Sequence, residues 1–198
     1  MPEFFKVAAR TTIPGGWGDY GDILEHGMAA RSNGRLALER TGPYIAPITF
    51  PAVGNVILTD DGRRQLESSG LSGFSLLPVE KAHIVELRWD QWDLTAEEPH
   101  EYPDSGEPED YILARPHSPI AARELGELWE VEVPLSIKIV RPAIVNSYKD
   151  LLIDPSTWNG ADLVRSKDFG SILYSEKARE CLSDLWGRFL EFHHFPTL

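Results

Sequence analysis

The residues best suited to a binding role are nine acidic side chains in a stretch with no lysine or arginine between Arg88 and Arg115. These acids are Asp90, Asp93, Glu97, Glu98, Glu101, Asp104, Glu107, Glu109 and Asp110. The aromatic residues Trp92 and Tyr102 lie among them. Large aromatic anchors surrounded by charge are typical of interfaces that attract a protein partner electrostatically. We therefore predict that residues 90–110, called the acidic segment below, bind a basic protein through the nine acids, Trp92 and Tyr102.

The competing interpretation of the acidic segment is a hydrated loop that is kept soluble by its charge. Pro99, Pro103 and Pro108 interrupt the segment, and it shows neither a helical nor a strand period, so we expect a long surface loop. Trp92 argues against a purely solvating role, because a large aromatic side chain favours burial in the protein's own core or against a partner.

Patterns for catalysis and cofactor binding are weaker. No serine has the spacing of a nucleophile elbow, and Cys181 falls on the apolar stripe of a predicted helix, where a thiol resists ionisation. No two of the six histidines have the spacing of metal ligands on one helix face. Gly16, Gly18 and Gly21 match the spacing of a dinucleotide-binding loop but lack its buried strand and helix. The sequence thus predicts no catalytic residue, no metal site and no cofactor.

The composition of the chain limits its class and its partners. Its 198 residues, 42% of them hydrophobic, can bury a core as one domain or as two subdomains, residues 1–115 and 116–198. The single cysteine excludes an internal disulfide and, with no secretory leader and no apolar stretch of membrane-spanning length, favours a cytoplasmic location. A formal charge of -12 disfavours nucleic acid as a ligand, because binding to phosphates needs lysine and arginine. We expect a protein partner and neither nucleic acid nor a membrane.

The elements that must position the acidic segment indicate an α+β fold, with a mixed or antiparallel sheet and a few helices packed on it. Residues 57–79 predict a strand, a helix capped by Thr59 and a return strand, with Gly70 ending the helix. Residues 128–140 alternate as a strand does, and Pro134 implies an edge, a bulge or a break into two strands. We also predict an edge or bent strand at 44–50, a strand at 83–89 and a short helix around 28–38. A C-terminal helix followed by a short strand is predicted over 176–195.

A second stretch echoes the strand–helix–strand unit. "ILTDDGRRQLESSGLSGF" begins at Ile57 and "LYSEKARECLSDLWGRF" at Leu173, and both place a threonine or serine, an acid, an arginine and a leucine in the same order. Such a unit cannot bury its apolar side alone, so two related strand–helix–strand subunits can share one sheet. We expect the echo to serve architecture, since no acid lies at a matched spacing from Arg63 and Arg179.

The stretches "LTDDGRRQLESSGLSGFSLLPVEKAHIVELRWDQWD" and "GELWEVEVPLS" resemble bacterial polymorphic-toxin immunity proteins, in particular the double-CXXCG immunity group and related immunity domains. This chain departs from that group because it lacks both CXXC pairs, and with them any zinc-supported element. The resemblance implies a cytoplasmic, non-catalytic inhibitor of a cognate toxin. Together with the charge, it leads us to expect an immunity protein that occludes the basic active site of a toxin such as a nuclease.

Three classes of function therefore predict three different surfaces. An immunity protein would bind its toxin through the acidic segment. The alternative, a small cytoplasmic hydrolase-like enzyme, would use surface carboxylates and histidines in a concave pocket. A ligand-sensing or scaffold domain would instead use the apolar edge of residues 128–140.

Overall fold

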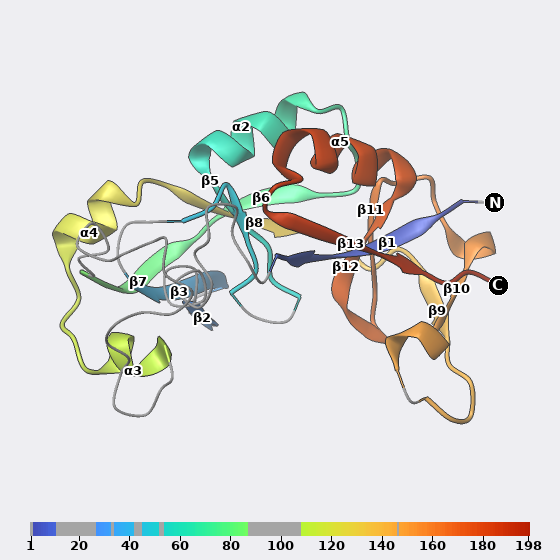
Figure 1. The fold of residues 1–198 in the computed structure, drawn as a ribbon, viewed down its shortest axis with the longest axis horizontal. Helices are drawn as coiled ribbons and strands as arrows, with labels where there is room; N and C mark the ends of the chain where they lie inside the picture. The colour runs from blue at the N-terminus through green and yellow to red at the C-terminus, as the bar shows by residue number, and fades with distance from the viewer. Residues whose placement is uncertain are drawn as a thin grey trace.

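The computed structural model describes residues 2–10, 27–32, 34–41, 45–51, 54–86, 108–145 and 147–198. Over these ranges the chain has the predicted α+β fold, in which helices pack on antiparallel and mixed sheets (Figure 1). The first sheet has the order β4 (Ile48–Thr49), β5 (Ile57–Thr59), β8 (Leu128–Glu132) and β6 (Ser75–Pro78). The second sheet has the order β11 (Leu163–Ser166), β12 (Phe169–Ser175), β1 (Phe4–Ala9) and β13 (Leu190–Phe195).

The remaining elements are two hairpins, one added strand and the helices. The hairpins are β2 (Gly27–Ser32) with β3 (Arg35–Thr41), and β9 (Lys138–Val140) with β10 (Leu152–Asp154). Strand β7 (Glu80–Val85) pairs in parallel with β3. The helices are α2 (Asp60–Ser68), α3 (Pro108–Leu113), α4 (Pro119–Glu124) and α5 (Glu176–Trp186), and the 3-10 turns are Tyr148–Asp150 and Pro155–Thr157.

The two four-stranded sheets have the same topology. In the first sheet α2 connects β5 to β6, and β8 lies between these two strands and antiparallel to both. In the second sheet α5 connects β12 to β13, and β1 lies between them in the same way. Each half of the chain also contains a hairpin, β2–β3 or β9–β10, before the short strand β4 or β11. The two predicted strand–helix–strand units are therefore equivalent parts of a structural repeat. The expectation that they share one sheet is wrong, because a further strand, β8 or β1, lies between the two strands of each unit and completes a separate sheet.

The two halves of the chain, residues 1–115 and 116–198, exchange their first strands, β1 and β8. Strand β1 precedes the elements of the first sheet in sequence but pairs with β12 and β13 of the second sheet. Strand β8 precedes the elements of the second sheet but pairs with β5 and β6 of the first. The sheets thus cross the boundary between the predicted subdomains 1–115 and 116–198. Each half needs the other to complete its sheet.

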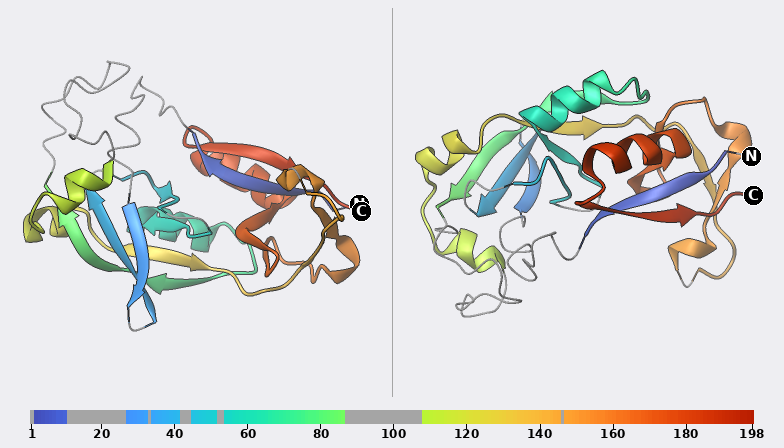
Figure 2. Two further views of the ribbon diagram at one scale, coloured as in Figure 1. Left: turned by 90° about the horizontal axis from the view of Figure 1, so that it is seen from below. Right: turned by 45° about the horizontal axis from the view of Figure 1, so that its top comes forward.

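Both repeat helices begin at a hydroxyl cap, which the sequence predicts at Thr59. The Thr59 hydroxyl accepts the Gly62 N–H at 3.1 Å, and the Ser175 hydroxyl accepts the Ala178 N–H at 3.2 Å. A capping hydroxyl satisfies one of the backbone donors that a helix start leaves without a partner. The two helices lie side by side, and the Trp186 indole donates to the Gln65 side chain at 2.6 Å between them (Figure 2).

The hydrophobic core repeats with the topology. A central cluster contains residues from both sheets and from the inner faces of α2 and α5, among them Leu66 and Leu182 at matched helix positions. Two outer clusters lie on the opposite faces of the two sheets. Matched positions in these outer clusters are Leu36 and Leu151, Leu38 and Ile153, Ile57 and Leu173, Val79 and Phe195, and Leu128 and Phe4. The central cluster holds the halves together because burial of apolar surface is the main force for folding.

The predicted helix around 28–38 is wrong, because these residues form the β2–β3 hairpin. Ser32 pairs with Arg35, which leaves a two-residue connection that ends in Gly34 with a φ of 81°. Glycine adopts this left-handed conformation without steric cost, as tight hairpin turns require. The predicted break at Pro134 is confirmed, since β8 ends at Glu132 and β9 begins at Lys138.

Among the parts of the chain that the structure describes, no helix has the length and apolar character needed to cross a bilayer.

Candidate functional site

The acidic segment lies almost wholly outside the described residues. This applies to the predicted interface residues Asp90, Trp92, Asp93, Glu97, Glu98, Glu101, Tyr102, Asp104 and Glu107. Glu109 and Asp110 belong to α3, where the Asp110 carbonyl accepts the Ala114 N–H at 2.9 Å. The structure therefore places the end of the acidic segment on a helix and leaves the rest of the prediction untested.

The acidic segment belongs to a longer stretch, residues 80–127, which we call the connecting segment because it joins β6 to β8 and so links the two repeats. It consists of β7, the acidic segment, α3 and α4. Ile84 and Ala121 place β7 and α4 in the outer core cluster of the first sheet. The connecting segment is thus packed on the repeat at both of its ends.

Hydrogen bonds hold β7 against the start of α4. The Ser118 N–H donates to the Ile84 carbonyl at 2.7 Å, and the Ile84 N–H donates to Nδ1 of His117 at 3.0 Å. A ring nitrogen that accepts a hydrogen bond carries no proton, so this contact places the proton of a neutral His117 on Nε2. Ser118 also caps α4, because its hydroxyl accepts the Ala121 N–H at 3.2 Å.

A second pair of contacts joins the chain just before the acidic segment to the chain just after it. Nε2 of His83 lies 2.9 Å from the Arg115 carbonyl, to which it donates. The Arg115 guanidinium donates back to the Glu86 carbonyl at 3.2 Å. These contacts bring the chain at Glu86 and the chain at Arg115 together.

A comparison with known protein families finds no family model that matches the sequence, and no curated protein is significantly similar to it. The candidate site is therefore defined by its residues alone.

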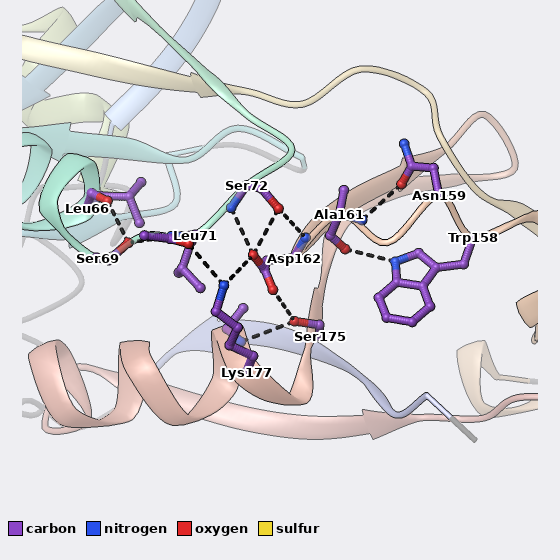
Figure 3. A network of polar contacts seen from close by, with 12 residues as sticks. Leu66, Ser69, Leu71, Ser72, Trp158, Asn159, Ala161, Asp162, Ser175 and Lys177 are labelled. Carbon is purple, nitrogen blue, oxygen red and sulfur yellow. Dashed lines mark hydrogen bonds and ion pairs between the residues drawn. The ribbon is translucent and has the colours of Figure 1, made fainter.

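A polar network around one buried carboxylate joins the two repeats at the start of α5 (Figure 3). Asp162 precedes β11 and is 6% exposed. Its carboxylate accepts the backbone N–H and the hydroxyl of Ser72, both at 2.9 Å, the Ser175 hydroxyl at 3.2 Å and the Lys177 amine at 3.0 Å. Lys177 also donates to the Gly70 carbonyl at 2.9 Å. Residues from the turn after α2 and from the start of α5 therefore share one carboxylate.

The electrostatics of this network favour the ionised carboxylate. Burial alone would raise the pKa of Asp162, but the hydrogen bonds from Lys177 and Ser72 outweigh it and hold the pKa below its ordinary value of 3.8. A serine beside a lysine becomes a nucleophile when the amine accepts its proton. Here the lysine and both serines donate to Asp162, so the geometry is that of a structural clamp.

Sequence reasoning did not single out this network. The capping position of Ser175 is visible in the sequence, but Ser72 and Asp162 are 90 residues apart with no signal that links them.

Two arginines stack on aromatic rings at matched positions of the repeat. Arg63 lies 4.8 Å from the Trp129 ring centroid, and Arg179 lies 5.3 Å from that of Phe5. The expectation that these arginines have no acid at a matched spacing is wrong. Arg63 donates to Asp60 and Arg179 to Glu176, each three residues earlier and each at 3.0 Å. Both pairs fix the helix start against the central strand of a sheet.

Two observations bear on the alternative functions. No group of three or more histidine, cysteine, aspartate or glutamate side chains within them is placed to hold a metal ion. Strand β8 is paired on both sides, with β5 and with β6, so residues 128–132 present no free strand edge to a scaffold partner.

Proposed function

We propose that this protein is an immunity protein, which binds a cognate bacterial toxin and neutralises it by covering a basic active-site surface with the acidic segment. The observation that carries the proposal is the charge pattern. Nine acids lie between Arg88 and Arg115, and no lysine or arginine lies among them. A surface of one sign raises the association rate with a partner of the opposite sign.

The way the acidic segment is attached supports the same role. The described chain before the acidic segment and the chain after it are joined by the contacts of His83 and Arg115, and α4 packs on the core beside them. A binding loop that starts and ends on a fixed base loses less conformational freedom on binding than a free tail does. The repeated core thus acts as the scaffold, and the connecting segment supplies the specific contacts.

The proposal is tested with the protein product of the adjacent reading frame as the candidate toxin. Neutralising three acids together (E97Q, E98Q and E101Q) should lower the association rate constant about tenfold at low salt, with a smaller effect at high salt. Trp92→Ala should raise the dissociation constant about 30-fold, as expected for an aromatic anchor. Surface plasmon resonance measures both, and protection of a host cell that expresses the toxin provides the functional readout.

The matched control neutralises three exposed acids outside the connecting segment, Glu180, Asp184 and Glu191, and removes the same charge. It should change the association rate constant less than twofold. If the control weakens binding as much as the acidic-segment variant, net charge alone drives association. If neither Trp92→Ala nor the triple variant changes affinity or protection, the acidic segment is not the interface.

A further inference from the structure

Strand β13 forms an outer edge of the second sheet, and among the described strands it pairs with β1 alone (Figure 2). Its six residues pair with Phe4–Ala9 without a bulge, and they include no proline and no lysine. Prolines, lysines, bulges and short lengths are the features that keep an outer strand from pairing with another chain. Strand β13 therefore has the length and regularity of an open edge.

The other outer strands of the two four-stranded sheets are protected. Strand β4 has only two residues, and the chain before β9 covers β11, where the Ser136 N–H donates to the Arg165 carbonyl at 2.9 Å. Strand β6 contains Pro78. The Val79 N–H donates to the Leu128 carbonyl at 3.0 Å, so the preceding residue, Pro78, faces outward in the ladder and presents no N–H there.

The backbone of β13 presents unpaired groups at its outer edge. The Arg10 N–H donates to the Phe189 carbonyl at 2.9 Å, which fixes the alternation of hydrogen-bonded pairs between β1 and β13. In this alternation Leu190, Phe192 and His194 turn their backbone groups away from β1. The Leu190 carbonyl accepts from Nε of Arg10 at 3.1 Å, but no described residue bonds to the outward groups of Phe192 and His194. These groups are available to a further strand.

The difference between the two repeats lies at one matched position. Pro78 is opposite Trp129 in the first sheet, and His194 is opposite Phe5 in the second. Trp129 and Phe5 are the two rings on which the matched arginines stack, so Pro78 and His194 are equivalent. The proline removes the outward donor of β6, whereas the histidine retains that of β13.

We propose that β13 pairs antiparallel with β13 of a second copy of this chain, about a two-fold axis at Phe192, so that the two second sheets form one continuous sheet. This register bonds Leu190 to His194 of the second copy and so uses every outward residue of the strand. The two Phe192 rings lie opposite each other at the axis, and aromatic pairs stabilise neighbouring strands.

Charge complementarity selects both the register and the second copy. With the axis at Phe192, Glu191 lies opposite His193 of the second copy on both sides of the axis, in the closely spaced pairs where side chains meet. The neighbouring registers would instead place the two Glu191 or the two His193 side chains opposite each other. An interface with two-fold symmetry uses the same residues on both copies, as this one does.

The assembly closes at two copies, because the other edge of the second sheet, β11, is covered. The interface does not use the connecting segment, which packs on the first sheet. The inference therefore does not depend on the proposed toxin-binding role.

Sedimentation equilibrium of the full chain tests the proposal, and the wild type should be a dimer at about 200 µM and dissociate on dilution. His194→Pro copies Pro78 and should raise the dissociation constant of the dimer at least about tenfold, because it removes an outward donor. His194→Ala is the matched control, since it removes the same side chain, keeps the N–H and should dimerise nearly as the wild type does. Circular dichroism of the dilute variants should show the native fold, because the first repeat carries a proline at this position.

A charge exchange tests the register without changing the backbone. Glu191→Lys and His193→Glu should each weaken the dimer, because each places like charges opposite each other on both sides of the axis. A mixture of these two variants should form a heterodimer that is more stable than either homodimer, since each acid then faces a lysine or a histidine. Native mass spectrometry measures the three species.

A wild type that stays monomeric at about 200 µM would overturn the proposal, as would a His194→Pro variant that dimerises as tightly as His194→Ala. Equal stability of the heterodimer and the homodimers would contradict the register. Toxin affinity of His194→Pro should stay at the wild-type value, which separates this test from that of the proposed function. Loss of toxin binding in this variant, with a monomeric wild type, would assign the edge to a toxin strand instead.

Discussion

Asp162 is a single side chain that connects three segments of the chain. It accepts hydrogen bonds from Ser72 in the turn after α2, from Ser175 at the end of β12 and from Lys177 in the first turn of α5. The matched position in the first repeat is Pro47, since the Thr59 N–H donates to the Pro47 carbonyl as the Ser175 N–H does to that of Asp162. The clamp therefore exists in one repeat only.

Asp162→Asn should lower the free energy of unfolding at pH 7 by about 2 kcal/mol, because it weakens several hydrogen bonds to a buried charge. Because the pKa of Asp162 is lower in the folded state than its ordinary value, the carboxylate stabilises the fold above that value. This contribution is lost as the pH falls through the folded pKa, below the ordinary value of 3.8. Urea unfolding of wild type and variant at pH 7 and in acid should show the difference between them shrinking in acid.

Asp154→Asn is the control for this prediction. Asp154 also accepts from a serine hydroxyl and a backbone N–H, both of Ser156, and the pKa of Asp154 is likewise lowered by these bonds. Since these contacts are exposed to solvent, its replacement should reduce stability less than that of Asp162. Equal losses for the two variants would contradict a clamp at Asp162.

At the scale of elements, the same capped helix is used twice in different surroundings. The Thr59 hydroxyl caps α2 only, whereas the Ser175 hydroxyl caps α5 and also donates to Asp162. The capping hydrogen bond joins residues three positions apart, whereas the contact between Ser175 and Asp162 depends on the tertiary structure.

Thr59→Ala should lower the free energy of unfolding by about 1 kcal/mol, the usual contribution of a capping hydroxyl. Ser175→Ala should lower it by about 2 kcal/mol, because a buried donor to Asp162 is lost as well. Chemical denaturation followed by tryptophan fluorescence measures both changes. Thr59→Ser keeps the cap and should stay close to wild type. If the two alanine variants lose the same stability, the contact between Ser175 and Asp162 contributes nothing.

For the whole molecule, the exchange of β1 and β8 ties two equivalent halves into one fold. Phe4 pairs with Phe195, and the ends of the chain lie at the same end of the molecule (Figure 1). A short linker could therefore join residue 198 to residue 2 as a β13–β1 hairpin. The new ends of this permuted chain would lie between residues 10 and 27. All four strands of the second sheet would then follow one another in the C-terminal half of the permuted sequence.

This permuted chain should fold to the native structure, with a free energy of unfolding within about 2 kcal/mol of the wild type, since only loop closure changes. Circular dichroism and urea unfolding provide the measurement. A chain that lacks residues 1–10 should fail to fold cooperatively, because β1 lies between β12 and β13 and its loss leaves two strand edges without a partner. A folded truncated chain together with an unfolded permutant would contradict the strand exchange.

Much of the local structure could be predicted from the sequence. The cap at Thr59, the left-handed Gly70 with a φ of 71° and the break at Pro134 are confirmed. Each of these signals depends on a few neighbouring residues, whose backbone preferences act locally. The turn at Gly34 has a local signal as well, because an asparagine followed by a glycine favours a two-residue hairpin turn.

By itself, the sequence determined where capped helices begin, where strands break and where negative charge is concentrated. Only the tertiary structure decided that β1 completes the second sheet, that Ser72 reaches Asp162 and that the Tyr174 hydroxyl is buried without a partner among the described residues. The physical reason is the separation along the sequence over which each interaction acts. Propensity, capping and charge are properties of adjacent residues, whereas strand pairing and burial depend on which distant apolar faces cover one another.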